Sequence, residues 1–81
     1  MDTHELKILP QYFNAVWNGH KTFELRKADR DYKVGDYLIL KEYTGEYYTG
    51  SFLKVIITYI LKDCTAYGLA EDYCILSFRK L

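Results

Sequence analysis

The sequence predicts a single small domain, residues 1–81, that is mainly β with one or two short helices in the order β-α-β-β-β-β. Five short stretches have the alternation or composition of strands, their connections are short, and one stretch is apolar on both faces. A small barrel closes the edges of such strands and takes one helix as a cap. An open α+β sheet is the alternative. No repeat, low-complexity tract or Pro/Gly-rich linker divides the chain.

The first strand and the helix are predicted from the N-terminal residues. In residues 4–9, HELKIL, polar and apolar side chains alternate, so Leu6 and Ile8 share one face and His4 is a terminal strand residue rather than a catalytic one. Pro10 suits the first position of a helix, where its missing N–H costs least. The apolar stripe of this helix consists of Phe13, Val16 and Trp17. Asn18 and Gly19 supply its C-terminal stop.

Four more strands are expected. In residues 21–27, KTFELRK, Phe23 and Leu25 point one way while the polar side chains point the other. Residues 28–36 have the composition of a turn. The later elements are strands at residues 37–43, 51–62 and 73–81, a hairpin loop at 44–50, and a connecting loop at 63–73 with room for a short turn of helix.

Aromatic residues must supply much of the core. A chain of this length buries only about 60% of the surface that its unfolded form exposes, and nine Tyr, four Phe and one Trp offset that deficit. The strand at 51–62 is apolar on both faces along its middle, so we expect both faces to be covered. The aromatic residues that we assign to the core are Phe13, Trp17, Phe52, Tyr59 and Phe78.

The charge balance narrows the function classes. Eleven basic and eleven acidic residues leave a formal net charge of zero. A protein that coats DNA without specificity normally carries a basic excess, because its affinity comes from neutralising phosphates. The balance therefore argues against a broad electrostatic binder, although a local cleft can be basic in a neutral molecule.

The cysteines and the apolar runs predict the cellular context. Cys64 and Cys74 form no CxxC motif, and no His stands at ligand spacing from them, so we expect two reduced thiols, no metal site and no cofactor. The longest apolar run, VIITYIL, is far too short to span a bilayer. The N-terminus lacks the basic and apolar regions of a signal peptide. We expect a cytoplasmic monomer that does not contact membranes.

Residues 19–36, GHKTFELRKADRDYKVGD, hold five basic and four acidic side chains. Thr22, Glu24 and Arg26 share the polar face of the strand that begins this stretch. One interpretation is a solvated face with a surface ion pair of little energetic value. The other is that Glu24 holds a cation in place while Arg26 presents its planar guanidinium to a phosphate or a base edge.

Other polar residues could shape the same cleft. Asp29 and Asp31 read as caps of backbone N–H groups in a turn, while Arg30 between them either anchors the loop to a carboxylate or faces a phosphate. Glu42 ends a row of otherwise apolar residues, so it lies at the open end of the barrel or is paired. Lys7, in the first strand, is a further cation.

Three tyrosines surround the hairpin loop. Tyr43, Tyr47 and Tyr48 could stack on bases, as aromatic platforms do in single-stranded RNA recognition, or could cover the end of the barrel. We expect two of the three to be structural. The complete set of predicted ligand-binding residues is Lys7, Lys21, Thr22, Glu24, Arg26, Arg30, Glu42 and Tyr43.

Several motifs together resemble a known group of domains. They are HELKILPQYF at the N-terminus, GHKTFELRK at residues 19–27, DRDY before VGD, and LKEY. In this order and spacing they resemble the ASCH group of the PUA-like superfamily, specifically short bacterial and phage domains that open with a HELKI…YF segment. The likeness extends from His4 to the last strand. It implies a PUA-like β-barrel with a cleft lined by the segment after the first helix, and binding of RNA or a nucleotide.

The resemblance also implies an enzymatic alternative. Some small ASCH proteins are amidohydrolases that remove an acyl group from acetylated cytidine, with a Lys, a Thr three residues later and a distal Glu. Lys21 matches this Lys, but Glu24 stands at the Thr position, and none of Glu42, Glu46 and Glu71 is well placed as the distal Glu. A carboxylate beside a lysine stabilises its charged form, which disfavours it as a base.

We therefore expect a binding module for RNA or a nucleotide rather than an enzyme. If the chain is an amidohydrolase acting on acylated cytidine-type nucleosides, Lys21 and Glu24 are its catalytic candidates. A protein-interaction domain that uses the tyrosine-rich loop is a further alternative.

Overall fold

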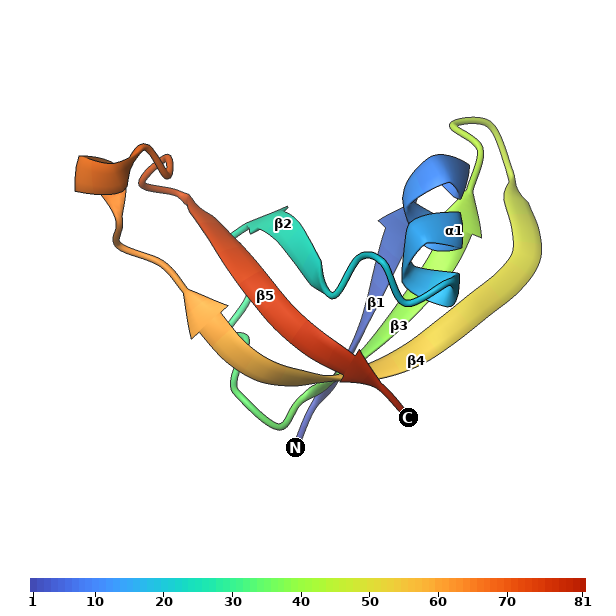
Figure 1. Ribbon diagram of the computed structural model, residues 1–81, viewed down its shortest axis with the longest axis horizontal. Coiled ribbons are helices and arrows are strands. Elements are labelled where there is room, and N and C mark those ends of the chain that lie inside the picture. Colours follow the sequence, from blue (N-terminus) through green and yellow to red (C-terminus); the bar gives the residue numbers. More distant parts are fainter.

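The secondary-structure elements of the computed structural model, which describes residues 1–81, follow the predicted order (Figure 1). The fold class is confirmed, since the protein is mainly β with one short α-helix and a single 3-10 turn. The elements are β1 (Thr3–Ile8), α1 (Pro10–Trp17), β2 (Phe23–Lys27), β3 (Tyr37–Tyr43), β4 (Tyr48–Leu61), the 3-10 turn Thr65–Tyr67 and β5 (Tyr73–Lys80).

All five strands belong to one mixed sheet in the order β1-β3-β4-β5-β2. β1 runs parallel to β3, and the other three pairs are antiparallel. The long strand β4 pairs with β3 through its first part and with β5 through its second, and it curves strongly along its length (Figure 1). Its register with β5 shifts between Ile57 and Tyr59, an irregularity of the kind that bends a strand. The sheet consequently curls into a half-barrel whose edge strands are β1 and β2.

The single α-helix covers the inside of this curve. Pro10 occupies its first turn, as predicted, and Asn18 ends it. Gly19 follows in the left-handed region with φ of 79°, and the N–H groups of His20 and Lys21 both donate to the carbonyl of Ala15, which satisfies the end of the helix. No helix of the structure has the length and apolar character needed to cross a membrane.

The core lies on the concave face of the sheet and under the helix. Phe13 and Phe78 belong to it, as predicted. The assignment of Trp17, Phe52 and Tyr59 to the core is wrong, because these side chains are 57%, 61% and 61% exposed. The core consists of Leu6, Ile8, Phe13, Val16, Tyr32, Leu38, Leu40, Val55, Ile57, Cys74, Leu76 and Phe78.

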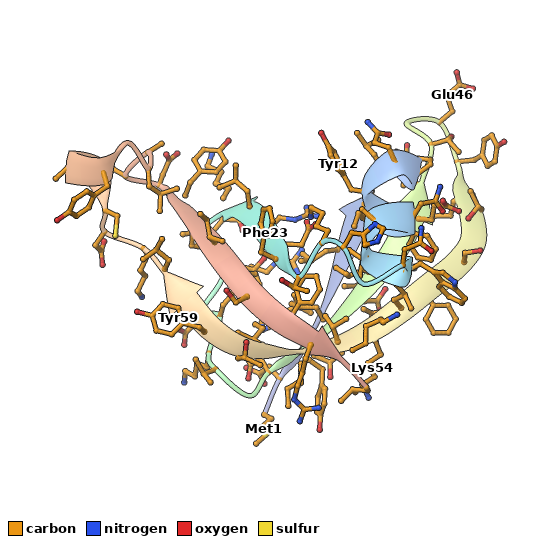
Figure 2. All side chains as sticks on the ribbon, in the orientation of Figure 1. Met1, Tyr12, Phe23, Glu46, Lys54 and Tyr59 are labelled. Carbon is orange, nitrogen blue, oxygen red and sulfur yellow. The ribbon has the colours of Figure 1, made fainter.

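The exposed aromatic residues of β4 have a simple geometric cause. Phe52 pairs with Lys41 and Tyr59 with Ser77, on the convex face of the sheet, where no second layer of structure lies. Figure 2 shows Tyr59 and Lys54 projecting from the outside of this curve. The expectation that both faces of residues 51–62 are covered is therefore wrong, since full burial occurs only at the inward-facing Val55 and Ile57.

β2 has its polar side chains inside and its apolar side chains outside. Glu24 is 5% exposed, while Phe23 and Leu25 are 45% and 54% exposed. The cause is the pairing with β5, in which Glu24 stands opposite Leu76. Because side chains alternate between faces, placing Leu76 in the core forces Glu24 inward as well. The interpretation of this polar face as solvated is thus wrong for Glu24.

The turn before β3 is held by Asp36 rather than by the predicted caps. The Asp36 carboxylate is buried and accepts hydrogen bonds from the N–H of Asp2 at 3.1 Å, the N–H of Lys33 at 3.1 Å and Nε2 of His4 at 2.9 Å. Asp31 instead forms an exposed ion pair with Lys33. Asp36 thereby ties the N-terminal strand to the turn between β2 and β3.

Both cysteines are free thiols. Cys64 is half-buried next to the 3-10 turn, whereas Cys74 is part of the core. Burial raises the pKa of the Cys74 thiol, so its reactive thiolate form is disfavoured.

We expect Leu76→Ala to lower the free energy of unfolding by about 2–5 kcal/mol, because the side chain is fully buried and its removal leaves a cavity. Leu25→Ala on the adjacent strand is the matched control and should change it by less than about 1 kcal/mol. Urea unfolding followed by circular dichroism gives both values. Equal losses of stability in the two variants would contradict the assignment of inner and outer faces.

The pKa of Asp36 is lowered, and the largest cause is the hydrogen bond from His4. The two backbone N–H groups lower this pKa further, whereas burial of the carboxyl group raises it. A carboxyl group whose pKa is lower in the folded state stabilises that state above its unfolded pKa of 3.8 and loses this contribution as the pH falls below it. The stability difference between the wild-type protein and Asp36→Asn should therefore be largest near neutral pH and shrink on acidification. A difference that is constant from neutral pH to about pH 3 would contradict this.

Candidate functional site

A cleft of about 450 Å³ opens between the two edge strands, beside the start of α1. β1 and the residue after it form one wall, β2 forms the other, and the first turn of α1 closes one side. Apolar and charged side chains line it together. The lining residues are Lys7, Ile8, Leu9, Tyr12, Lys21, Phe23, Glu24, Leu25 and Arg26.

The buried Glu24 carboxylate is held by a cation on each oxygen. Lys21 donates to Oε1 at 2.5 Å, and Nε of Arg26 donates to Oε2 at 3.1 Å. The ammonium of Lys21 also donates to the carbonyl of Phe23 at 2.7 Å. Because the Lys21 and Arg26 side chains are only 16% and 26% exposed, the three groups form a largely desolvated network in which two cations share one carboxylate, leaving a formal charge of +1. No buried side-chain polar atom is left without a partner.

Two arginines connect the open edges of the half-barrel. Nη2 of Arg26 donates to the carbonyl oxygen of Lys7, and Nη1 of Arg30 donates to the carbonyl oxygen of Glu5 at 3.2 Å. Alternate carbonyl groups of an edge strand point away from the sheet and need partners. Side-chain guanidinium groups thus satisfy part of the β1 edge where an adjacent strand would do so in a closed barrel.

Aromatic rings form the apolar part of the wall. Tyr12 extends from the first turn of α1 and Phe23 begins β2, as labelled in Figure 2. The Lys21 ammonium lies 5.5 Å from the Tyr12 ring centroid and 5.0 Å from that of Phe23. Both rings are about half exposed, so they remain accessible to a ligand.

The structure brings four of the eight predicted site residues into this cleft: Lys7, Lys21, Glu24 and Arg26. Arg30 lies next to the cleft, where it donates to the carbonyl oxygen of Glu5 in β1. Tyr43 lies on the outer face, where its ring is 4.6 Å from the Lys7 ammonium. Two predicted residues lie elsewhere: Thr22 is exposed, and Glu42 accepts a hydrogen bond from the Thr49 hydroxyl at 2.7 Å.

The charges of the cleft do not follow the neutrality of the whole chain. Three basic residues, Lys7, Lys21 and Arg26, and one acidic residue, Glu24, are among those that line it, so the formal charge of the lining residues is three minus one, or +2. The Lys7 ammonium itself lies toward the Tyr43 ring, 4.6 Å from its centroid. No group of three or more His, Cys, Asp or Glu side chains is arranged to hold a metal ion. The cleft is therefore suited to an anionic ligand with an apolar or aromatic part.

Sequence reasoning missed the apolar half of the lining: Ile8, Leu9, Tyr12, Phe23 and Leu25. A signal was present for two of these residues. Tyr12 is a large aromatic residue that lies outside the apolar stripe of its helix. Phe23 precedes Glu24, whose carboxylate is turned inward by the pairing of β2 with β5. The other three residues line the cleft only because the sheet curls and leaves its edges unpaired.

The fold and the cleft define a small half-barrel domain with a positively charged cleft between its edge strands. Residues 3–78 match the family described as Domain of unknown function (DUF3850), and the chain belongs to this family. It is also 40% identical over 75 residues to a protein of Escherichia phage P2 described as "Uncharacterized 12.9 kDa protein in GpA 3'region". That alignment covers 90% of this chain and 64% of the phage protein, so the chain spans just under two thirds of its relative.

Replacing Glu24 by Gln should lower the free energy of unfolding by about 2–4 kcal/mol, because two partly buried cations lose their counter-charge while the side chain keeps its size. Asp31→Asn, which breaks the exposed pair with Lys33, should cost less than about 1 kcal/mol. Chemical denaturation measures both. A Glu24→Gln protein as stable as the Asp31→Asn control would show that the network contributes little to the fold.

Proposed function

We propose that the cleft binds one nucleotide unit, either as a free nucleotide or as part of an RNA strand. The observation that carries this proposal is the combination of accessible Tyr12 and Phe23 rings with the Lys21–Glu24–Arg26 network in one cleft. A base has an aromatic face that stacks on such rings, and a phosphate is an anion that lysine and arginine bind. A second cavity also has aromatic rings and lysines, Trp17 and Phe52 with Lys54 and Lys80, but among its lining residues no carboxylate holds the cations in place.

The size of the cleft supports a ligand of this class. Pockets for small molecules commonly have volumes of roughly 300–1,000 Å³ and a mainly apolar lining with a few placed polar groups. A volume of about 450 Å³ lies toward the lower end of that range and accommodates a single base with its sugar and phosphate rather than a folded partner. The half-barrel and the helix after its first strand agree with the ASCH and PUA-like resemblance, which by itself implies RNA or nucleotide binding.

Each charged group has a specific part in the proposed complex. The Lys21 ammonium supplies the attraction for phosphate inside the cleft, and two N–H groups of Arg26 are already committed to Glu24 and to β1. The Lys7 ammonium, beside the Tyr43 ring, adds positive charge at the outer side. Arg26 therefore acts mainly by positioning the wall, with its remaining donors free for the ligand. The Glu24 carboxylate keeps Lys21 in place beside the two rings.

The same contacts favour binding over hydrolysis. Lys21 donates to the Glu24 carboxylate at 2.5 Å and to the Phe23 carbonyl oxygen at 2.7 Å, so two protein groups already engage its amino group. A general base must come within hydrogen-bond reach of the substrate proton that it removes, and both of these contacts would have to break first. We therefore propose no amidohydrolase reaction at this site.

Tyr12→Ala should weaken nucleotide binding by about 5- to 100-fold, the range expected when one stacking contact is removed. Amide NMR signals would be followed during titration with AMP, CMP, GMP, UMP and short RNA, and shifts are expected at residues 7–12 and 21–26. Tyr67→Ala is the matched control, because that tyrosine is 92% exposed and lies far along the chain from the cleft. If saturating concentrations of all these ligands leave the cleft signals unmoved, the proposal is wrong.

A further inference from the structure

A second aromatic and cationic surface lies next to the cleft, on the outer face of β1, β3 and the hairpin that follows. We call it the outer platform and define it as Lys7, Lys41, Tyr43 and Tyr48. Lys7 stands opposite Lys41 across the β1–β3 pair, and Tyr43 stands opposite Tyr48 across the β3–β4 pair. The two tyrosine rings are 5.0 Å apart. The β3–β4 register shifts between Lys41 and Tyr43, and the contacts of both lysines with the tyrosine rings show that all four side chains lie on one side of the sheet.

The lysines of the outer platform lie against its rings. The Lys7 ammonium is 4.6 Å from the Tyr43 centroid and 5.9 Å from that of Tyr48, and the Lys41 ammonium is 4.7 Å from Tyr48. Lys41 also pairs with Glu5 at 3.2 Å, but both side chains of that pair are well exposed. Such an ion pair contributes little, so it does not hold Lys41 firmly.

Lys7 belongs to both surfaces. It is a lining residue of the cleft, where its carbonyl oxygen accepts a hydrogen bond from Arg26, and its ammonium covers the rings of Tyr43 and Tyr48. The cleft and the outer platform are thus continuous around the unpaired β1 edge, without an intervening element. A chain molecule whose end occupies the cleft would meet the outer platform next.

The outer platform can exchange its internal contacts for ligand contacts. An exposed cation–π contact is weaker than the stacking of a base on an aromatic ring, and a lysine displaced from a ring gains a charge-assisted contact when it reaches a phosphate. Alternating rings and cations are the arrangement by which proteins bind single strands with little sequence preference.

We infer that the ligand of this protein is a single-stranded nucleic acid of several nucleotides, with one nucleotide in the cleft and the next ones on the outer platform. The placement of one nucleotide in the cleft rests on the proposed function. Lys41 and Tyr48 are the new binding residues: Tyr48 supplies a stacking surface, and Lys41 neutralises a phosphate. The contrasting explanation is that these contacts only stabilise cross-strand packing.

The test compares a labelled six-nucleotide RNA of mixed sequence, a DNA of the same sequence and the four nucleoside monophosphates. Fluorescence anisotropy measures the oligonucleotides, and NMR measures the monophosphates. The variants are Lys41→Met, which keeps an unbranched apolar stem, and Tyr48→Leu, which keeps an apolar strand residue. Lys54→Met is the matched control, because Lys54 lies 4.4 Å from the Tyr37 ring on the same outer face but away from the cleft. Unfolding midpoints confirm that each variant is folded.

We expect the oligonucleotide to bind at least about tenfold more tightly than any monophosphate, and each platform variant to bind it at least about fivefold more weakly than wild type. Monophosphate binding should stay within about twofold of wild type. The log–log slope of affinity against salt should become shallower by about 0.7 in Lys41→Met, because this variant no longer neutralises one phosphate. The RNA and DNA arms show which sugar is preferred, and tight binding of either strand supports the inference.

Three results separate this inference from the proposed function. If monophosphates bind but the hexamers bind no more tightly, or if Lys54→Met weakens binding as much as Lys41→Met, the outer platform is overturned and the cleft proposal stands. If hexamer affinity depends on Lys41 and Tyr48 but not on Tyr12, the platform stands and the cleft proposal fails. If neither monophosphates nor hexamers bind, both are wrong.

Discussion

The Glu24 carboxylate accepts one hydrogen bond from Lys21 and one from Arg26, and the Arg26 guanidinium continues to the carbonyl oxygen of Lys7 in β1. This chain of contacts joins the segment after the helix, the edge strand β2 and the opposite edge strand β1. Without these contacts, the charged Glu24 side chain of β2 would lie unpaired against the core. The contact of Arg30 with the carbonyl oxygen of Glu5 would then be the only arginine bridge to β1. The fold and the cleft therefore depend on the same three side chains.

The unpaired edges explain why the cleft exists. A closed barrel would pair β1 with β2 and fill the space between them, whereas in this sheet the two strands are at opposite ends of the strand order. Exposed edges invite unwanted pairing with other chains, and charged side chains commonly counteract it. Arg26 and Arg30 satisfy edge carbonyls in this way, and they leave between the strands an opening lined by apolar side chains and cations.

The distribution of charge in space also matters more than its total. The chain is neutral, yet the lining of its cleft carries a formal charge of +2, and further lysines lie on the adjoining outer face. Most of the acidic side chains that balance this charge lie outside the cleft. One of them is Asp36, whose carboxylate ties the N-terminus to the turn before β3. A small neutral domain can thus present one locally cationic surface without being a general polyanion binder.

The sequence by itself determined the order of the elements, the bounds of β3 and the start and end of α1, because alternation, Pro10 and Asn18–Gly19 are local signals. It also singled out Lys21, Glu24 and Arg26 as cleft candidates, since charges clustered along one strand can be counted without knowing the fold, and it added Lys7 from the first strand as a further cation. Only the tertiary structure decided which face of each strand is inside. Pairing with β5 turned Glu24 inward and left Leu25 outside, and the absence of a second layer left Phe52 and Tyr59 exposed. Alternation specifies two faces, but which one is buried depends on partners distant in the chain, and a single strand does not contain that information.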